Sequence, residues 1–303
     1  MATVPPPPSH QWIGASGDNW VLHQQRLDRM LQAFGDAAIA AADIRAGEHI
    51  LDIGCGAGAT SFDLAARTGA DGQVLGVDIS PQLIARAEAD APEDAPVSFQ
   101  LADAATAPLE PGTFDLLFSR FGVMFFDEPI AAFGHMRTAL KPGGRLAFAC
   151  WRAPAANDWF RLPMTAIGHL VTPAPGDPLA PGPFAFADPA RVEAILATAD
   201  FADIDIIPFD AVIPYGEGAT RDEAIDDALL LASAVGPLSR ALADQSNEIR
   251  VKSSEVVRAA FAGQPGETSI LIDGAAWIVT AINVNKNVAR HNDTPVSKPR
   301  IAL

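Results

Sequence analysis

The amino-acid sequence predicts an α/β fold built around a doubly wound, mostly parallel sheet, and three observations predict this fold class. Short apolar segments alternate with helical patterns between residues 49 and 151. These segments are rich in residues that suit a sheet covered on both faces. Their connections are short, as expected for parallel strands joined by right-handed helical crossovers. Ligands of such sheets bind at the carboxyl ends of the strands, so we expect the functional site there.

The helices and strands can be placed in order along the chain. An amphipathic helix, WVLHQQRLDRMLQAF, precedes the sheet at residues 20–34. A later helix is expected to begin at Pro81 with Ser80 as its cap, and another ends at the KPGG sequence. Helical patterns near 220–235 and 239–262 separate the last two strand candidates, which is too long a connection for a hairpin turn. The expected strands are 49–54, 73–80, 97–103, 114–119, 144–151, 203–216 and 268–282.

The chain divides into a sheet domain with additions at both ends. Residues 1–45 are expected to form an N-terminal helical lid, and residues 46–283 to form the sheet domain. Within that domain, residues 155–187 and 216–262 interrupt the alternation of strands and helices, and we interpret both as insertions that cover the substrate. Residues 284–303 differ in character and hold two of the four lysines of the chain, which predicts a disordered tail.

Composition predicts a cytoplasmic protein that acts on a small molecule. The formal charge is −16, with 37 acidic against 21 basic residues, and such a chain repels the phosphates of nucleic acids. No run approaches the roughly 18 apolar residues of a membrane span, and the N-terminal sequence lacks the features of a signal peptide. Cys55 and Cys150 are the only cysteines, which suits a reducing compartment and offers no thiolate metal site. The oligomeric state stays open.

The glycine-rich turn in ILDIGCGAG predicts a ligand that approaches the backbone closely. Gly54, Gly56 and Gly58 stand between a strand and a helix, where glycines permit a tight turn. Glycines at this spacing also occur in dinucleotide-binding proteins, and Asp78 stands about where those proteins place a ribose-binding carboxylate. Asp52 separates the two interpretations, because a carboxylate there repels a pyrophosphate but attracts an ammonium or a sulfonium group.

Five segments carry a resemblance to a known family. ILDIGCGAG, GVDIS, LADAATAPL, FDLLFSRFGVMFF and LKPGGRLAFACW follow the order and spacing of class I S-adenosylmethionine-dependent methyltransferases. The resemblance covers residues 45–152, and within the superfamily it is similar to the branch of quinone-methylating and related small-molecule enzymes. It implies a Rossmann-like sheet of seven strands with an antiparallel last strand, for which residues 270–282 are the candidate.

The resemblance also implies which residues bind S-adenosylmethionine. Asp52 and the Gly54–Gly58 loop, including Cys55 and Gly56, would hold the methionine portion. Asp78 would accept hydrogen bonds from both ribose hydroxyls.

The remaining implied contacts follow the second, third and fourth strands. Ile79 would pack on the adenine, Asp103 would bind its amino group, and Ala104 would offer a backbone amide to the ring. Ser119 and Arg120, at the end of the fourth strand, would line the methionine end.

Three residues are candidates for catalysis. His23 shares an apolar stripe with Leu27 and Phe34, so it either packs in the core or faces a bound ligand. His169 is a candidate because it lies just past the fifth strand, on the polar side of its segment. Arg120 is a candidate because it follows a strand end beside the apolar FGVMFF segment.

Together these features predict methyl transfer to a small aromatic or apolar acceptor by direct in-line displacement, with S-adenosylhomocysteine as product. Aromatic side chains near the expected strand ends suit such an acceptor. They are Phe121, Phe125, Phe126, Trp151, Trp159, Phe160, Phe184 and Phe186. No cluster of ligands indicates a metal. Two alternatives remain: an NAD(P)-dependent oxidoreductase, which Asp52 opposes, and a non-catalytic S-adenosylmethionine-binding protein, because the sequence indicates no certain general base.

Overall fold

A seven-stranded sheet forms the centre of the molecule. The computed structural model describes residues 12, 14–171, 177 and 179–284. The strand order is β3-β2-β1-β4-β5-β7-β6, and β7 runs antiparallel to both of its neighbours while the first five strands are parallel. The predicted mostly parallel sheet with an antiparallel last strand is therefore confirmed. The strands are β1 (His49–Ile53), β2 (Gln73–Asp78), β3 (Val97–Leu101), β4 (Phe114–Arg120), β5 (Leu140–Trp151), β6 (Phe201–Glu217) and β7 (Ser269–Asn283).

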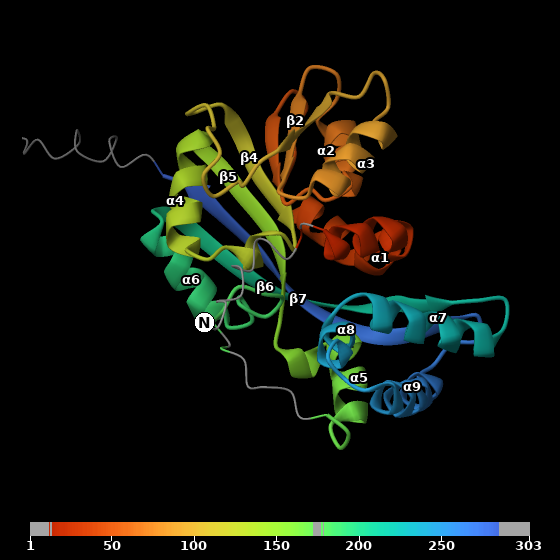
Figure 1. The fold of residues 1–303 in the computed structure, drawn as a ribbon. Coiled ribbons are helices and arrows are strands. Elements are labelled where there is room, and N and C mark those ends of the chain that lie inside the picture. The colour runs from red at the N-terminus through yellow and green to blue at the C-terminus, as the bar shows by residue number, and fades with distance from the viewer. Residues whose placement is uncertain (1–11, 13, 172–176, 178, 285–303) are drawn as a thin grey trace, which may run out of the picture.

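Helices cover both faces of the sheet and extend beyond one end of it (Figure 1). Helices α1, α2 and α3 lie together on one face, and α4 and α6 lie on the other. Helices α5, α7, α8 and α9 gather around the outer ends of β6 and β7, and we call these four helices the lid. The helices are α1 (Ala15–Ala41), α2 (Ala59–Thr68), α3 (Pro81–Asp90), α4 (Pro129–Ala139), α5 (Asp158–Ile167), α6 (Pro189–Thr198), α7 (Arg221–Ala234), α8 (Pro237–Leu242) and α9 (Asn247–Ala262).

Two sequence expectations concern the C-terminal tail and membrane-spanning segments. The predicted tail, 284–303, lies outside the described residues except for its first residue. None of the helices in the described part of the chain is long and apolar enough to cross a membrane.

The start of α3 differs in detail from the sequence prediction. Pro81 occupies the first helical position as expected, because its missing N–H needs no partner there. Ser80 precedes it, but its hydroxyl makes no capping hydrogen bond to the helix. Instead, the backbone N–H of Ser80 donates to Asp78 Oδ1 over 2.9 Å. The strand-end carboxylate therefore organises this turn.

Helix α1, which makes up most of the predicted N-terminal lid of residues 1–45, packs into the core of the sheet domain. Leu27, Phe34 and Ala38 are buried. The Phe34 ring meets the rings of Phe121 and Trp151 edge-on, with centroids 5.7 and 5.1 Å apart. The apolar stripe of α1 thus packs against residues of the sheet, so this helix is a fixed part of the fold over its second half.

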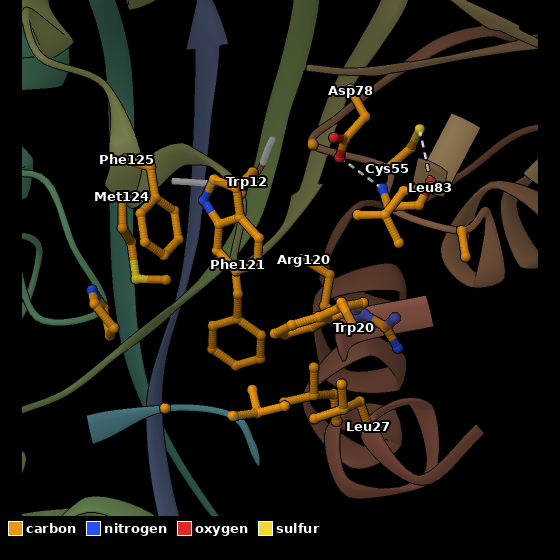
Figure 2. Close-up of a pocket in the computed structure, with 18 of the residues that line it drawn as sticks. Trp12, Trp20, Leu27, Cys55, Asp78, Leu83, Arg120, Phe121, Met124 and Phe125 are labelled. Atoms are coloured by element: carbon orange, nitrogen blue, oxygen red, sulfur yellow. Dashed lines mark hydrogen bonds between the residues drawn. The ribbon is translucent and has the colours of Figure 1, made fainter. Parts of the chain in front are cut away.

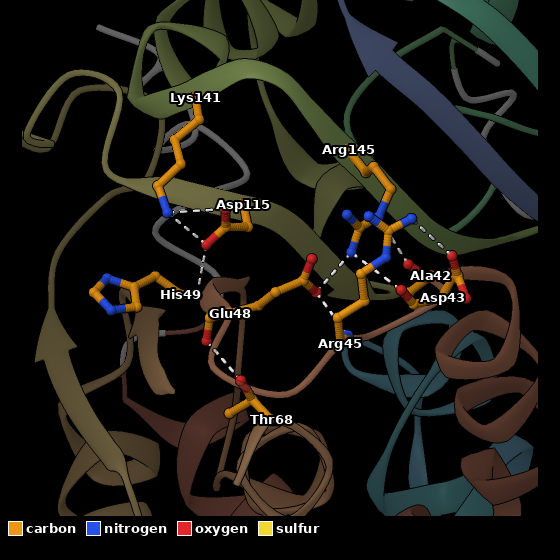
Figure 3. A network of polar contacts seen from close by, with 9 residues as sticks. All are labelled: Ala42, Asp43, Arg45, Glu48, His49, Thr68, Asp115, Lys141 and Arg145. Carbon is orange, nitrogen blue, oxygen red and sulfur yellow. Dashed lines mark hydrogen bonds and ion pairs between the residues drawn. The ribbon is translucent and has the colours of Figure 1, made fainter. Parts of the chain in front are cut away.

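A polar network fastens the amino-terminal edge of the sheet, opposite the strand ends where ligands bind (Figure 3). The Glu48 carboxylate accepts from Arg145 over 2.7 Å, and Arg145 also donates to the carbonyl that follows α1. Lys141 donates to Asp115 over 2.7 and 2.8 Å, and the His49 N–H donates to the same carboxylate over 2.9 Å. Contacts of this kind fix β1, β4 and β5 relative to one another.

The two longest strands carry part of the lid away from the core. β6 and β7 pair from Phe201 opposite Asn283 to Glu217 opposite Ser269. Beyond that pair, the N–H of Gly218 donates to the Thr268 carbonyl over 3.0 Å. Helices α7, α8 and α9 lie between these two points in the sequence.

Replacement of Phe34 by Ala tests whether α1 belongs to the core. Phe34 is 0% exposed, so its truncation should cost about 3–5 kcal/mol of unfolding free energy through lost burial and a residual cavity. Urea unfolding measures this. Leu22→Ala on the same helix is the control, because Leu22 is 75% exposed and its truncation should change stability by less than about 0.5 kcal/mol. Similar small effects for both would show that α1 is a detachable lid.

Candidate functional site

A cavity of about 750 Å³ opens at the carboxyl ends of β1, β2 and β4. Figure 2 shows its contrasting walls: Asp78 and Cys55 lie at one end, and Phe121, Phe125 and Trp12 gather at the other. Helix α1 lines one side, and segments of the lid complete the lining. The cavity lies where the sequence predicts the functional site, and it joins the glycine-rich turn to an aromatic pocket.

Each of the three positions in the turn favours glycine for a different physical reason. All have positive φ, at 65° for Gly54, 57° for Gly56 and 87° for Gly58, so each favours glycine. A Cβ on Gly56 would meet no atom within 4 Å, which leaves its backbone open toward the cavity that it lines. A Cβ on Gly54 would lie 2.9 Å from Gly122 Cα, and one on Gly58 would lie 2.9 Å from the Phe99 ring. Gly54 and Gly56 both line the cavity, and Gly56 leaves open space there, whereas Gly58 serves internal packing.

Asp52 lies beneath the cavity and is not part of its wall, which differs from the predicted direct contact with a ligand. The side chain is 0% exposed, and its Oδ2 accepts from Thr60 and Ser61 over 2.9 and 2.7 Å. Oδ1 has no hydrogen-bond partner among the described residues. Burial raises the pKa of Asp52 to about 6, against the opposing effects of the two hydroxyls and of Arg120. Thr60, which lines the cavity, separates this carboxyl group from a ligand.

Asp78 and Ile79 line the cavity, as predicted. Asp78 Oδ2 accepts from the N–H of Gly56 over 2.9 Å, so the strand-end carboxylate holds the glycine turn in place. Burial raises the pKa of Asp78, while backbone N–H groups of Ser80, Gly56 and Ile79 oppose the shift. Cys55 also lines the cavity, and burial raises the pKa of its thiol well above its usual range, so it stays protonated.

The residues after β3 also take the predicted places. Asp103 and Ala104 line the cavity; Asp103 is exposed, and Ala104 is 6% exposed. Asp103 Oδ1 accepts from the N–H of Ala105 over 2.9 Å, which closes a tight turn. This turn presents the Asp103 side chain and the Ala104 backbone on the same wall as Ile79.

Ser119 is a structural residue at the end of β4, which corrects the prediction that it lines the ligand. It is 0% exposed; its Oγ donates to the Ile53 carbonyl over 2.7 Å and accepts from the Gly122 N–H over 3.1 Å. A Cβ on Gly122 would lie 2.6 Å from the Ile53 carbonyl oxygen. Sequence reasoning missed Gly122, although a glycine directly after a strand end was the signal.

Phe121 adopts a backbone conformation that is rare for an aromatic residue. Its φ is 63°, and its ring stacks on Trp151 with centroids 4.0 Å apart and planes 15° apart. Such a conformation persists only where surrounding contacts hold it, and these strained positions cluster at functional sites. The stacked pair forms one side of the cavity.

Arg120 lines the cavity as predicted but is already paired. Its Nη2 lies 2.7 Å from Asp28 Oδ1, and both side chains are mostly buried. Asp28 comes from α1 and lines the same cavity, yet no sequence signal joined it to Arg120. The pair ties α1 to the end of β4. The charge of Arg120 is therefore balanced within the protein, and the pair fixes the orientation of its guanidinium in the cavity wall.

The aromatic residues singled out in the sequence separate into two groups. Five of them line the cavity, namely Phe121, Phe125, Phe126, Trp151 and Trp159. The other three pack behind it: Phe184 stacks on Trp159 at 5.3 Å, Phe160 meets Phe184 edge-on, and Phe186 packs in the core against Phe133. Trp12 and Trp20 add to the lining from the N-terminal side.

The histidines predicted as candidate bases lie elsewhere. His23 is buried between α1 and α7 and does not line the cavity; burial and the nearby Arg26 lower its pKa. His169 is exposed and also stands outside the lining. The structure therefore brings neither histidine to the candidate site. Within the described ranges, no group of three or more His, Cys, Asp or Glu side chains is arranged to hold a metal ion.

Comparison with known proteins finds similarity in the central part of the chain. Residues 51–148 match a protein family described as a methyltransferase domain. Aklanonic acid methyltransferase DauC of Streptomyces sp. (strain C5) is 38% identical over 104 residues, which are 34% of this chain and 47% of that protein. Nocamycin O-methyltransferase of Saccharothrix syringae is 32% identical over 162 residues, which are 52% of this chain and 55% of that protein.

The chain thus spans about half the length of these curated relatives. Among solved structures, the YcgJ protein of Bacillus subtilis has a TM-score of 0.55 at 20% identity, and the match covers 84% of this chain and 99% of that one. This likeness shows a shared fold, which agrees with the strand order described above.

Asp52→Asn separates the charge of residue 52 from its packing. Burial raises the folded-state pKa from 3.8 to about 6, so the ionised carboxylate destabilises the folded protein. This cost is absent below about pH 4 and complete above about pH 6, where it amounts to about 3 kcal/mol. From pH 4 to pH 7, the unfolding free energy of the wild-type protein should therefore fall by about this amount relative to Asp52→Asn.

Urea unfolding at the two pH values measures this difference. Asp71→Asn is the control, because Asp71 is exposed and should follow the wild-type pH dependence. A difference between Asp52→Asn and wild type that does not change with pH would show that Asp52 titrates normally.

Proposed function

We propose that this chain, whose residues 51–148 match a family described as a methyltransferase domain, is a class I S-adenosylmethionine-dependent methyltransferase that acts on a small aromatic or otherwise apolar acceptor. One observation carries the proposal. A single cavity joins the glycine turn to the pocket of stacked aromatic rings. Two relatives, named as an aklanonic acid methyltransferase and a nocamycin O-methyltransferase, support a small-molecule acceptor.

The cavity residues fit S-adenosylmethionine in both shape and charge. Gly56 leaves open space where a side chain would stand, and Asp78 lies beside it at the end of β2. Asp103 and Ala104 would hold the adenine, and Ile79 would pack on it. When bound, this cofactor supplies a methyl group activated by a sulfonium cation.

Asp52 adds an electrostatic contribution to this fit. Its Oδ1 has no partner among the described residues, so the buried carboxyl group places an incompletely compensated negative charge under the glycine turn. A cationic ligand in the cavity favours the ionised form of this group. Through Thr60, the charge acts across the cavity wall without contact.

The aromatic wall aligns the acceptor and excludes water. Phe121 and Trp151 form a rigid stacked face, and Phe125 and Trp159 extend the apolar lining. Alignment of two reactants can supply about 7–11 kcal/mol of rate enhancement. Exclusion of water strengthens electrostatic interactions within the site.

The lining residues that the structure describes offer the acceptor little help with proton removal. Arg120 and Asp28 are paired, the Cys55 thiol is protonated, and burial raises the pKa of Tyr215 far from neutrality. We therefore propose an acceptor that arrives already nucleophilic, such as an electron-rich aromatic carbon or a phenol of low pKa. Direct displacement requires no covalent intermediate on the protein.

Binding and mass measurements separate this function from the alternatives. S-adenosylmethionine should raise the thermal midpoint, since a ligand at 100 times its Kd adds about 2.7 kcal/mol of stability, whereas NAD and NADP should have no effect. Stabilisation by NAD or NADP instead would favour an oxidoreductase. Incubation with aromatic acceptors should then yield products heavier by one CH₂ group. Cofactor binding without such a product from any acceptor would favour a non-catalytic binding protein.

Asp78→Ala should weaken S-adenosylmethionine binding by about 10- to 100-fold, because it removes a charged acceptor and releases the Gly56 N–H. Asp78→Asn keeps one acceptor oxygen and should lose less. Isothermal calorimetry on the folded variants measures both affinities. Asp71→Ala, an exposed carboxylate on the loop before β2, should bind as tightly as wild type. Unchanged affinity in both Asp78 variants would remove this residue from the cofactor site.

A further inference from the structure

We propose that the acceptor carries an anionic oxygen group, a carboxylate or a phosphate, and that Arg240 of the lid binds this group. The inference rests on the proposed function, because it assigns a specificity-determining residue to the acceptor. It follows from the pairing of the arginines, the position of Arg240, and the polar groups beside it.

Arg240 differs from every other arginine in the part of the chain that the structure describes. The others donate side-chain hydrogen bonds to carboxylates, to backbone carbonyls or to a side-chain amide. The Arg240 guanidinium has no such partner among the described residues. In a chain of formal charge −16, acidic partners are plentiful, so an unpaired guanidinium is unusual here. A guanidinium stays protonated at neutral pH, so this charge remains to be balanced.

Arg240 lines the cavity from the lid. It stands on α8, which follows α7 through Val235 and Gly236, and both of these linking residues line the cavity as well. The side chain is exposed, yet the surrounding protein lowers its pKa by desolvation, and no nearby carboxylate opposes that shift. The guanidinium thus lines a partly enclosed space in which an anion would meet reduced competition from water.

The place of α8 in the fold assigns Arg240 to the acceptor. Figure 1 shows α8 among the lid helices α5 and α7, away from α2 and α3, which flank the glycine turn. The cation at the strand-end side of the cavity, Arg120, is already paired with Asp28. Arg240 is therefore the cation available to a molecule held between the aromatic wall and the lid.

Two neutral hydroxyl groups line the same cavity as the Arg240 guanidinium. Tyr215 of β6 and Ser239 of α8 both line the cavity, and neither side chain has a hydrogen-bond partner among the described residues. Burial raises the pKa of the Tyr215 phenol, so it remains a donor at neutral pH. Guanidinium and hydroxyl donors together suit an oxyanion, and the planar fork of arginine binds carboxylate or phosphate through two parallel hydrogen bonds.

Calorimetry on the full chain saturated with S-adenosylhomocysteine tests the inference. The probes are benzoate, 2-naphthoate and anthracene-2-carboxylate, each paired with its carboxamide, and naphthyl phosphate with naphthol as the second anionic class. At least one anion should bind about 10-fold or more tightly than its neutral partner. Arg240→Gln should abolish this preference, and Arg240→Lys should keep part of it. The matched control is Arg67→Gln, an exposed arginine of α2 that bonds only a carbonyl of its own helix and should keep the full preference.

The remaining outcomes overturn the inference or the proposed function separately. Equal binding of anions and neutral partners, binding of neither, or a preference that survives Arg240→Gln would overturn the inference. Weaker S-adenosylhomocysteine binding in Arg240→Gln would assign the guanidinium to the carboxylate of the cofactor, which also overturns it. Failure of the wild-type chain to bind S-adenosylhomocysteine would instead overturn the proposed function.

Discussion

The close approach of two backbone segments, at the ends of β1 and β4, determines both halves of the cavity. Gly54 and Gly122 come so near that neither position has room for a side chain. Ser119 fastens the contact by bonding the Ile53 carbonyl and the Gly122 N–H with one hydroxyl. On one side, the contact shapes the glycine turn. On the other, it adjoins the strained backbone of Phe121, whose ring stacks on Trp151, so the glycine turn and the aromatic wall share one rigid element.

Most charged groups in or beneath the cavity have an ion-pair or hydrogen-bond partner within the protein. Asp28 neutralises Arg120 and ties α1 to β4, while the two hydroxyls beneath the glycine turn satisfy one oxygen of Asp52. Among the described residues, the second Asp52 oxygen beneath the glycine turn and the Arg240 guanidinium on the lid side have no such partner. Asp78 and Asp103 also line the cavity, so its lining carries more negative than positive charge, and Arg240 is the cation on the lid side.

The fold was predictable because each strand carries a local signal, whereas much of the site depends on contacts between distant residues. The strand ends could be placed from apolar runs and glycines, and the resemblance assigned Asp78, Ile79, Asp103 and Ala104 to a common wall, where they lie. Asp28 was missed because its partner is 92 residues away.

The predictions that the structure corrects failed for the same reason, because they depend on contacts between residues that are distant in the sequence. Apolar periodicity predicted that α1 has a buried face, but not that this face both packs into the core of the sheet domain and lines the cavity. The buried His23 faces α7 and the Arg26–Asp227 pair, an environment set by the tertiary fold. Likewise, the sequence around Phe186 resembles the sequence around the aromatic residues that line the cavity. Phe186 nevertheless packs in the core against Phe133 and Phe148.

The hydrogen bond between Gly218 and Thr268 has an evolutionary consequence. Because residues 219–267 leave and rejoin the β6–β7 ribbon at one point, this segment is a cassette whose two ends are already adjacent. Replacement of the cassette by one of another length changes the entropic cost of loop closure only slightly, because that cost rises slowly with loop length. It also leaves every described pairing of the sheet intact. Recombination of one contiguous stretch of coding sequence can therefore replace the lid side of the cavity, while the glycine turn and the strand ends stay unaltered.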